Sequence, residues 1–379
     1  MTIEVHGTWD EKFDPVIETF KQSLAAGLDT GASFCGTIEG ETVIDVWAGH
    51  ADKEKTQPWE KDTIINVYSS TKTMASLVML MLADRGEIDF YEKVTAYWPE
   101  FGQNGKEGIE VRHFMSHSAG LSGLDEEVTE DQIYDHDYIC ALLARQKPWW
   151  EPGSQSGYHA LTQGYLQGEI VRRVTGKTLG AFFAEEVAGP LGADFFIGVP
   201  PEKDPQVITI LPPEGSALAT PEGDGIAART FASPKVDATW AGHEGWRRAE
   251  IPAANGHGNA RSVAEIHKIL ANGGKAKGRR FLSEEGVRRI FDVQTEGEDL
   301  VLKMPITFGM GFGLNSEAMP LSPNANTCFW GGWGGSLIAI DNDAHITGSY
   351  VMNQMAEGLI GDVRGGLLWG GFLGAALGQ

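Results

Sequence analysis

The chain contains few cysteines and few basic residues for its length. Its 379 residues include three cysteines, Cys35, Cys140 and Cys328, which are too few and too widely spaced for a disulfide framework or a zinc knuckle. Lys and Arg number 30 against 52 Asp and Glu, which gives a formal net charge of −22 at pH 7. This excess of negative charge argues against nucleic acid and against an anionic membrane surface as partners.

Several functional motifs are also missing. Residues 1–6 have neither the basic nor the apolar segment of a secretory signal, so we expect a cytoplasmic protein. No Gly-x-Ser-x-Gly sequence occurs, which excludes the nucleophile elbow of an α/β-hydrolase. The glycines at 331–335 are not followed by a helix with Lys-Ser or Lys-Thr, so no phosphate-binding loop is predicted.

A candidate nucleophile precedes a helix that the sequence predicts to be buried. Positions 74–83 are apolar almost all round and repeat at steps of three and four, but the segment is too short to cross a bilayer. Ser69 lies at or just before the first turn, and Lys72 follows on the same face. Burial favours the neutral form of a lysine, which makes Lys72 a possible base for Ser69. The motif alone favours a more ordinary interpretation, in which Ser69 caps the helix and Lys72 extends to solvent.

Two later segments supply possible partners for this pair. Tyr158 follows the loop Glu151-Pro152-Gly153 and precedes a predicted helix, so its phenol can project into a cleft and carry a proton. The segment 329–336 is a strand with four glycines, which lets a substrate approach the backbone and exposes N–H groups to an oxyanion. Each segment also has an ordinary interpretation. Tyr158 could be a half-buried tyrosine bonded to the backbone, and the segment 329–336 could be a strand that packs closely against tryptophans.

In combination these motifs resemble the serine β-lactamase superfamily, in the branch that contains class C β-lactamases and family VIII carboxylesterases. Ser69-x-x-Lys72, Tyr158 and the Gly-rich strand at Trp330 occur in the order typical of that branch. The similarity runs from about residue 13 to the C-terminus and includes the stretches Val111–Leu121, Asn259–Arg261 and Phe308–Gly313.

The resemblance implies a role for each matching residue. Ser69 would be the nucleophile, and Lys72 with Tyr158 would serve as its base and proton shuttle. The backbone N–H groups of Ser69 and Trp333 would form the oxyanion hole. Residues 330–332 would occupy the place of the Lys-Thr-Gly triplet of the lactamases, so Trp330, Gly331 and Gly332, together with His159, are the expected substrate pocket.

The sequence departs from the lactamases at two positions that bind a β-lactam. Ala160 stands where class C enzymes carry an asparagine that holds the side-chain amide, and Trp330 replaces the lysine of the triplet. Trp330 therefore suggests an apolar acyl or alcohol pocket, although Arg364 could receive an anionic group. We expect a carboxylesterase acting on small neutral esters. Alternatives are an amidase, β-lactamase or acyltransferase that uses the same residues, and a binding protein without activity.

The predicted elements give an α/β protein of the α+β type. An antiparallel sheet flanked by N- and C-terminal helices would be formed by residues 1–68 and 252–379. A mainly helical domain, 69–251, would be inserted, with the active site at the interface. The expected strands are 33–38, 42–47, 62–67, 308–314, 328–330, 336–341 and 346–352. The clearest helices are 14–24, 74–83, 161–174, 179–187, 260–270, 284–291 and a final one within 359–377.

No metal or cofactor is predicted. His113 and His117 are four residues apart, as zinc ligands on a helix are, but no glutamate lies between them and no third ligand is evident. Asp135-His136-Asp137 is interpreted as a solvated loop. The expected partner is a small-molecule ester, with neither nucleic acid nor membrane, and a homo-oligomer is possible.

Overall fold

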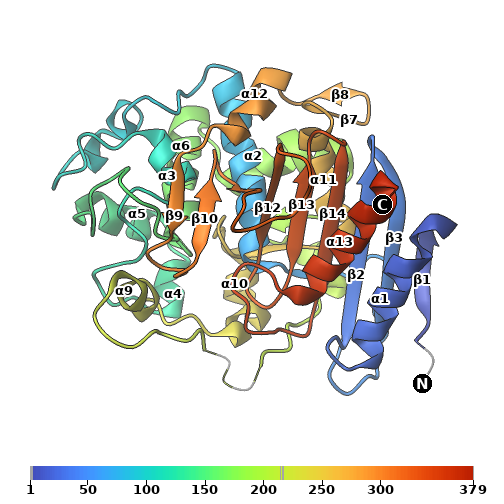
Figure 1. Ribbon diagram of the computed structural model, residues 1–379. Coiled ribbons are helices and arrows are strands. Elements are labelled where there is room, and N and C mark those ends of the chain that lie inside the picture. Colours follow the sequence, from blue (N-terminus) through green and yellow to red (C-terminus); the bar gives the residue numbers. More distant parts are fainter. Residues whose placement is uncertain (1–2, 214, 216, 379) are drawn as a thin grey trace.

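The computed structural model describes residues 3–213, 215 and 217–378. Among these residues, the central feature is an antiparallel sheet of nine strands in the order β1-β3-β2-β14-β13-β12-β11-β10-β9 (Figure 1). The strands are β1 (Val5–Trp9), β2 (Gly31–Ile38), β3 (Glu41–Gly49), β9 (Thr295–Glu298), β10 (Pro305–Phe308), β11 (Gly313–Leu314), β12 (Thr327–Gly331), β13 (Leu337–Asp341) and β14 (Ile346–Met352). The two ends of the chain meet where β14 pairs with β2.

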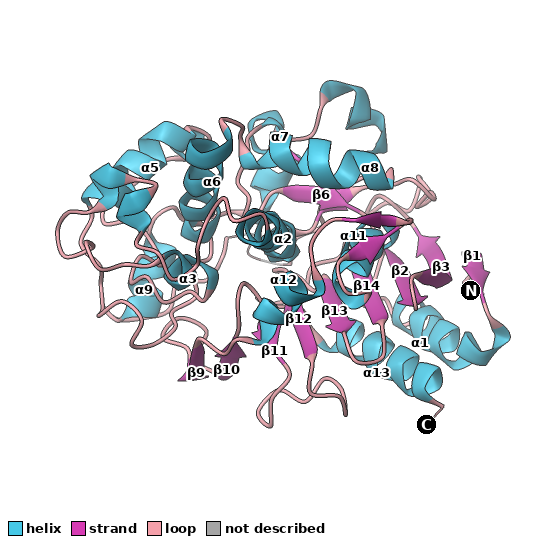
Figure 2. Cartoon of the chain, turned by 90° about the horizontal axis from the view of Figure 1, so that it is seen from above, coloured by secondary structure: helices cyan, strands magenta, loops and turns pink. Residues whose placement is uncertain are grey.

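Helices cover both faces of this sheet. The terminal helices α1 (Asp14–Ala25) and α13 (Val363–Leu377) lie on one face, and α11 (Ala260–Ala271) lies on the other (Figure 2). Gly36 and Gly348 allow α13 to approach closely, because a Cβ on either would lie 2.6 Å from the ring of Phe372 or Trp369. Since both faces are covered, the central strands are buried on both sides, unlike a sheet with one face in water.

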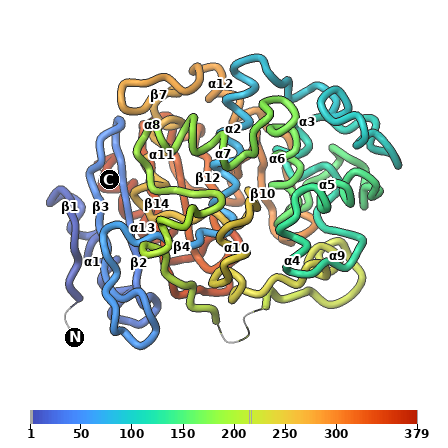
Figure 3. The backbone as a smooth tube through the Cα atoms, turned by 180° about the vertical axis from the view of Figure 1, so that it is seen from behind, coloured from blue at the N-terminus to red at the C-terminus, as the bar shows by residue number. Residues whose placement is uncertain are grey.

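The segment between β3 and α11 folds mainly into helices around α2 (Thr71–Asp84), which runs through the middle of the molecule (Figures 1 and 3). Every residue from Thr71 to Ala83 is buried, as expected for a helix that is apolar almost all round. The other helices of this segment are α3 (Val111–Met115), α4 (Glu130–Ile133), α5 (His136–Arg145), α6 (Thr162–Thr175), α7 (Leu179–Phe183), α8 (Gly189–Leu191), α9 (Ile226–Ala232) and α10 (Glu244–Arg248). The short helix α12 (Glu284–Arg288), which follows α11 in the chain, also contacts α2. No helix among the described residues combines the length and apolar character needed to cross a membrane.

The predicted fold class is confirmed, with differences in detail. The strand expected over 308–314 is instead a hairpin of β10 and β11, because the chain turns at Gly309–Phe312. The helix expected to end before Gly189-Pro190 continues through them to Leu191, after a π-helical segment over Ala184–Ala188. The edge strands β1 and β9 were not predicted. The proposed boundary of a helical domain at residues 69 and 251 stays a prediction.

Candidate active site

Ser69 lies in a tight turn at the start of α2. The short strand β4 (Ile65–Asn66) pairs with β6 (Gly256–Gly258) and leads into a 3-10 turn over Tyr68–Ser70. Tyr68 has φ of +43°, a strained value for a residue with a Cβ. Its phenol donates a hydrogen bond to the carbonyl of Ala238 over 3.2 Å, which helps to hold this conformation. The strained backbone at Tyr68 therefore helps to determine the direction in which the side chain of Ser69 projects.

The amine of Lys72 is buried and directed at the serine. Its Nζ lies 3.1 Å from Oγ of Ser69, 2.7 Å from the carbonyl oxygen of Ala160 and 2.8 Å from that of Ala253. Burial lowers the pKa of Lys72 well below its usual range. A neutral amine has two N–H donors, which match the two carbonyls, and its lone pair then faces the Ser69 hydroxyl. The geometry thus suits an amine that accepts a proton from Ser69.

The phenol of Tyr158 contacts the serine on its other side. Its hydroxyl donates a hydrogen bond to Oγ of Ser69 over 2.5 Å, and Nζ of Lys72 lies 4.8 Å from the centre of its ring. Burial raises the pKa of Tyr158, and the hydrogen bond with Ser69 offsets only part of that effect. The phenol is therefore protonated at neutral pH. The hydroxyl of Ser69 therefore accepts a hydrogen bond from the phenol of Tyr158 on one side and can donate one to the amine of Lys72 on the other.

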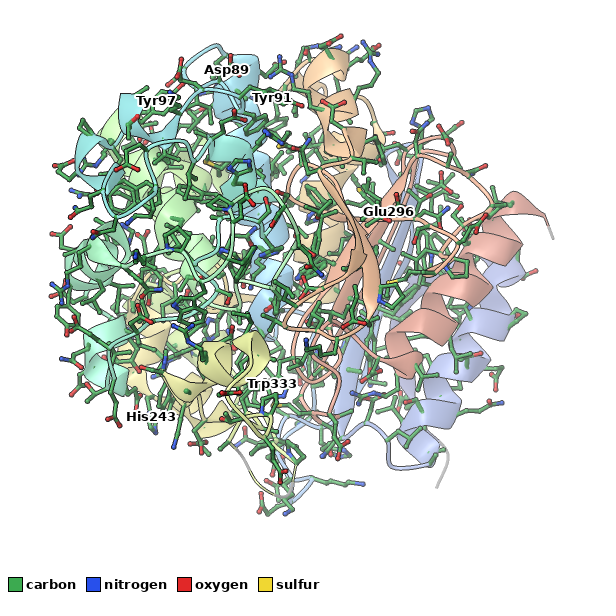
Figure 4. The ribbon with its side chains drawn as sticks, turned by 60° about the vertical axis from the view of Figure 1, so that its left-hand side comes forward. Asp89, Tyr91, Tyr97, His243, Glu296 and Trp333 are labelled. Atoms are coloured by element: carbon green, nitrogen blue, oxygen red, sulfur yellow. The ribbon has the colours of Figure 1, made fainter. Side chains whose placement is uncertain are left out.

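Two backbone N–H groups at the site, those of Ser69 and Trp333, have no acceptor within the described part of the chain. Neither the N–H of Ser69 nor that of Trp333 donates a hydrogen bond to any described residue. Trp333 belongs to the turn between β12 and β13 and lies at the boundary between the helical region and the sheet (Figure 4). Its ring centre lies 5.1 Å from that of Tyr68. Gly332 permits this close contact, because a Cβ there would lie 2.2 Å from the carbonyl oxygen of Val67.

Arg364 does not receive a substrate anion, contrary to the possibility raised from the sequence. Its guanidinium is buried and pairs with Asp29 over 2.7 Å and with Asp362 over 2.6 Å. It also donates to the carbonyl of Gly334 over 2.7 Å. Arg364 therefore anchors the turn that carries Trp333.

Asp299 was not identified from the sequence, yet it holds the backbone of Tyr158. This fully buried residue accepts hydrogen bonds on Oδ1 from the N–H groups of Tyr158 (3.0 Å), Val301 (2.8 Å) and Leu302 (2.8 Å). It lies in the loop between β9 and β10, about 140 residues beyond Tyr158 in the sequence. Periodicity offers no signal for such a contact. The available hint in the sequence was an Asp directly before three apolar residues, Leu300, Val301 and Leu302.

An apolar cavity opens beside Ser69 and extends into the helical region. Its exposed surface is mostly apolar, and several of the side chains around it, including Ile139 and Trp246, are fully buried. Ser69, Tyr158, Ala160, Trp246 and Trp333 are among its lining residues. Other lining residues come from α4, α5 and α6: Ile133, Ile139, Thr162 and Tyr165.

The four residues expected to form the substrate pocket do not line this cavity. Trp330 lies behind Tyr158, with ring centres 5.5 Å apart. Gly331 packs against the backbone of residues 360 and 361, and Gly332 packs against Val67. The imidazole of His159 has both nitrogens bonded to backbone, to the carbonyl of Gly157 and the N–H of Leu121, and burial lowers its pKa to about 3. These four residues therefore face away from the cavity and pack behind the residues that line it.

His113 and His117, which the sequence raised as possible zinc ligands, each use one ring nitrogen to bind the backbone. Nδ1 of His117 accepts from the N–H of His159, and Nδ1 of His113 accepts from the N–H of Glu110. A different trio, His136, Cys140 and Glu169, has its ligand atoms within 4.8 Å of one another. The carboxylate of Glu169 is already bound by Arg172 and Arg173, so two positive charges oppose a cation there.

The segment around His136 was also interpreted incorrectly. Asp135 accepts from the N–H of Tyr138 and caps α5, and His136 is the first residue of that helix and contacts Glu169. It is therefore the start of a helix and not a solvated loop.

Comparison with known proteins identifies relatives along the whole chain. The Beta-lactamase family matches residues 17–365. The esterase/beta-lactamase LipL of Mycobacterium tuberculosis is 35% identical over 370 residues, covering 94% of this chain and 84% of LipL. A family VIII carboxylesterase of known structure is 40% identical, with a TM-score of 0.92, covering 97% of this chain and 99% of the other. A penicillin-binding protein homologue from Caulobacter crescentus is 38% identical, with a TM-score of 0.90, covering 97% and 98%. The chain belongs to the beta-lactamase family.

Proposed function

We propose that this protein is a serine carboxylesterase that cleaves small neutral esters through an acyl-enzyme on Ser69. One observation carries the proposal: the Ser69 hydroxyl lies between the amine of Lys72, at 3.1 Å, and the phenol of Tyr158, at 2.5 Å. The names of LipL and of the family VIII carboxylesterase support ester hydrolysis as the reaction.

Acylation begins with the neutral amine of Lys72. As Oγ of Ser69 bonds to the ester carbonyl carbon, its proton passes to Lys72. The carbonyl electron pair moves onto oxygen, where the N–H groups of Ser69 and Trp333 stabilise it, each by about 3–4 kcal/mol. The bond from carbon to the alcohol oxygen then breaks. Tyr158 gives its proton to the departing alkoxide, and the proton held on Lys72 restores the phenol.

Deacylation repeats these transfers with water in place of the alcohol. Water gives a proton to the pair of Lys72 and Tyr158 as its oxygen bonds to the acyl carbon. The bond from carbon to Oγ of Ser69 then breaks, the serine regains a proton, and a carboxylic acid leaves. No metal or other cofactor is required to balance either step.

The chemistry of the surroundings favours an ester over a β-lactam. No charged side chain among the described residues lines the cavity beside Ser69. Trp330 and Ala160 replace the lysine and asparagine that would hold a β-lactam, and the guanidinium of Arg364 is paired within the fold. An anionic substrate would therefore lose its hydration without gaining a partner.

The test compares wild type with Ser69→Ala on p-nitrophenyl acetate and on a chromogenic cephalosporin. We expect ester hydrolysis that the Ser69→Ala variant lacks, and far slower turnover of the cephalosporin. Ser76→Ala is a matched control, because Ser76 lies on the same helix and donates to the carbonyl of Gly311. Undiminished ester turnover by Ser69→Ala would refute the proposal. Failure of a fluorophosphonate to label Ser69 would instead favour a binding protein.

We propose the cytoplasm as the compartment. All three cysteines are free and buried, which suits a reducing environment. The net charge of −22 supports a small neutral ester as the partner in preference to nucleic acid.

A further inference from the structure

The outward side of α13 is apolar along its whole length. The helix lies beside α1 on the outside of the sheet (Figure 2). Its exposed positions among the described residues are Val363, Gly366, Leu367, Gly370 and Gly371, so the helix exposes no charged or polar side chain. Val363 and Leu367 are 70% and 60% exposed, more than any other large apolar side chain that the structure describes. Such a face is typical of a contact surface, because a helix face in water normally carries polar residues.

An apolar groove lies against the first turn of this helix. Gly366 lines the groove, and so does Asp362, the one charged residue among the described lining residues. The carboxylate of Asp362 pairs with the buried guanidinium of Arg364 over 2.6 Å, so the groove offers no free charge. Half-buried apolar side chains form most of its wall: Leu302, Met304, Met319, Leu321, Leu359 and Ile360.

The groove and the exposed side chains lie on either side of Gly366. Gly365 packs against Leu337 of the sheet, and Leu337 and Gly366 both line the groove. Successive residues of a helix are about 100° apart, so Val363 and Leu367 lie roughly 60° and 100° from Gly366 on the side away from Leu337. The surface thus has a hollow and a projection next to each other. A two-fold rotation brings the projection of one copy onto the hollow of the other, and the same contact forms twice.

The charge of the chain favours a second copy at this face in particular. A net charge of −22 makes two copies repel each other wherever their carboxylates meet. The outward side of α13 and the groove beside it contain no unpaired charge among the described residues, so two copies can approach here without that repulsion. A cationic partner would gain nothing from this face and would be attracted to the acidic surface elsewhere.

We propose that this face is the interface of a homodimer. Val363 and Leu367 of each copy enter the groove of the other, about a two-fold axis near Gly366. The glycine at that position lets the two backbones approach closely, because nothing of its own chain lies within 4 Å of where its Cβ would be. The inference goes beyond the proposed ester hydrolysis and does not depend on it.

Sedimentation equilibrium of the full chain at micromolar concentrations tests the interface. We expect wild type to approach twice the 41.0 kDa of one chain. Leu367→Glu should raise the dimer Kd by about 100-fold or more, because the symmetry buries two charges without partners. Met319→Glu, on the groove wall, should weaken the dimer by a similar factor. Val363→Glu serves if either variant fails to fold, because an acidic residue is favourable in the first turn of a helix.

Tyr91→Glu is the matched control and should leave the Kd unchanged. Tyr91 is 55% exposed and lies far from α13 (Figure 4). A wild type that keeps the mass of one chain overturns the proposal. It is also overturned by a dimer that Leu367→Glu and Val363→Glu leave intact, or that Met319→Glu leaves intact, because the contact then lies elsewhere.

A lipid surface is the other occupant that the same variants can identify. A monomer that sediments with phosphatidylcholine vesicles, and no longer does so as Val363→Glu, would assign the face to a membrane and overturn the dimer. None of these outcomes bears on Ser69, because the esterase is tested separately by hydrolysis of p-nitrophenyl acetate.

Discussion

Lys72→Met should change how the stability of the protein depends on pH. Lys72 is 2% exposed, and its amine donates to two backbone carbonyls over 2.7 and 2.8 Å. Burial lowers its pKa in the folded state well below the value near 10.4 of an exposed lysine. Between those two pKa values the unfolded chain binds a proton on Lys72 that the folded protein does not. Protonation therefore favours unfolding, and stability increases with pH across that window.

The expected magnitude follows from this linkage. Within the window, the free energy of unfolding of wild type should gain about 1.4 kcal/mol per pH unit relative to Lys72→Met. Above pH ~10.4 the difference should level off, because both states are then neutral. The variant also loses two hydrogen bonds, and each orphaned carbonyl costs about 1–3 kcal/mol. That cost does not depend on pH, so it shifts the curve without altering its slope.

Urea unfolding of wild type and Lys72→Met at several pH values from 7 to 10 measures this difference. Ser69→Ala is the control, because it keeps the buried amine and should keep the slope of wild type. The pH at which the slope begins should coincide with the acid limb of kcat/KM, since a protonated Lys72 cannot accept the serine proton. Parallel pH curves for wild type and Lys72→Met would refute a buried neutral amine.

Substitutions at three further residues test Tyr158, Arg364 and Asp299. Tyr158→Phe removes the hydroxyl that donates to Ser69 and should lower kcat by about 100-fold or more. The far-UV circular dichroism spectrum of the variant should match that of wild type. A near-normal kcat would contradict the role of Tyr158 as the acid. Arg364→Met leaves the carboxylate of Asp29 buried without its cation and should reduce the free energy of unfolding by about 3–5 kcal/mol in urea titrations. A change of KM alone would instead indicate that Arg364 binds substrate. Asp299→Ala removes three hydrogen bonds, each worth about 1.5–3 kcal/mol, and should lower both thermal stability and kcat. Asp299→Asn keeps an acceptor oxygen and should recover most of the thermal stability and most of kcat. If the two Asp299 variants lose thermal stability and kcat equally, the carboxylate does not act by positioning the backbone of Tyr158.

Elements with a strong local pattern were predicted well from the sequence. The hairpin of β2 and β3 and the helices α1, α2, α6 and α11 lie close to their expected bounds. Their apolar residues recur at the spacing of one secondary structure, and that spacing depends on neighbours in the chain. The turn within 308–314 was missed, because a strand and a tight hairpin with the same apolar residues differ only in pairing.

The resemblance predicted that Lys72 and Tyr158 act on Ser69, and the structure brings the three side chains together. The sequence placed Ser69 and Lys72 on one helix face and identified Tyr158 as a possible partner. It assigned the substrate pocket to Trp330 and its neighbours, and these residues do not line the cavity beside Ser69, which is lined in part by residues of α4, α5 and α6. The face that a Gly-rich strand presents to a substrate depends on which segments pack behind the strand. No local pattern in the sequence predicts that packing.

The sequence by itself determined the helices and strands that have a strong local period, the burial of α2 and the types of residue available for acyl transfer, because periodicity and residue chemistry act over a few positions. Only the tertiary structure decided that the Tyr158 phenol lies 2.5 Å from Ser69, that Asp299 holds the Tyr158 backbone and that Arg364 is paired with Asp29. Each of those contacts joins segments that are about 90 to 340 residues apart. The reason is physical: a buried charge or hydroxyl takes its pKa and its partner from whatever the folded chain brings beside it.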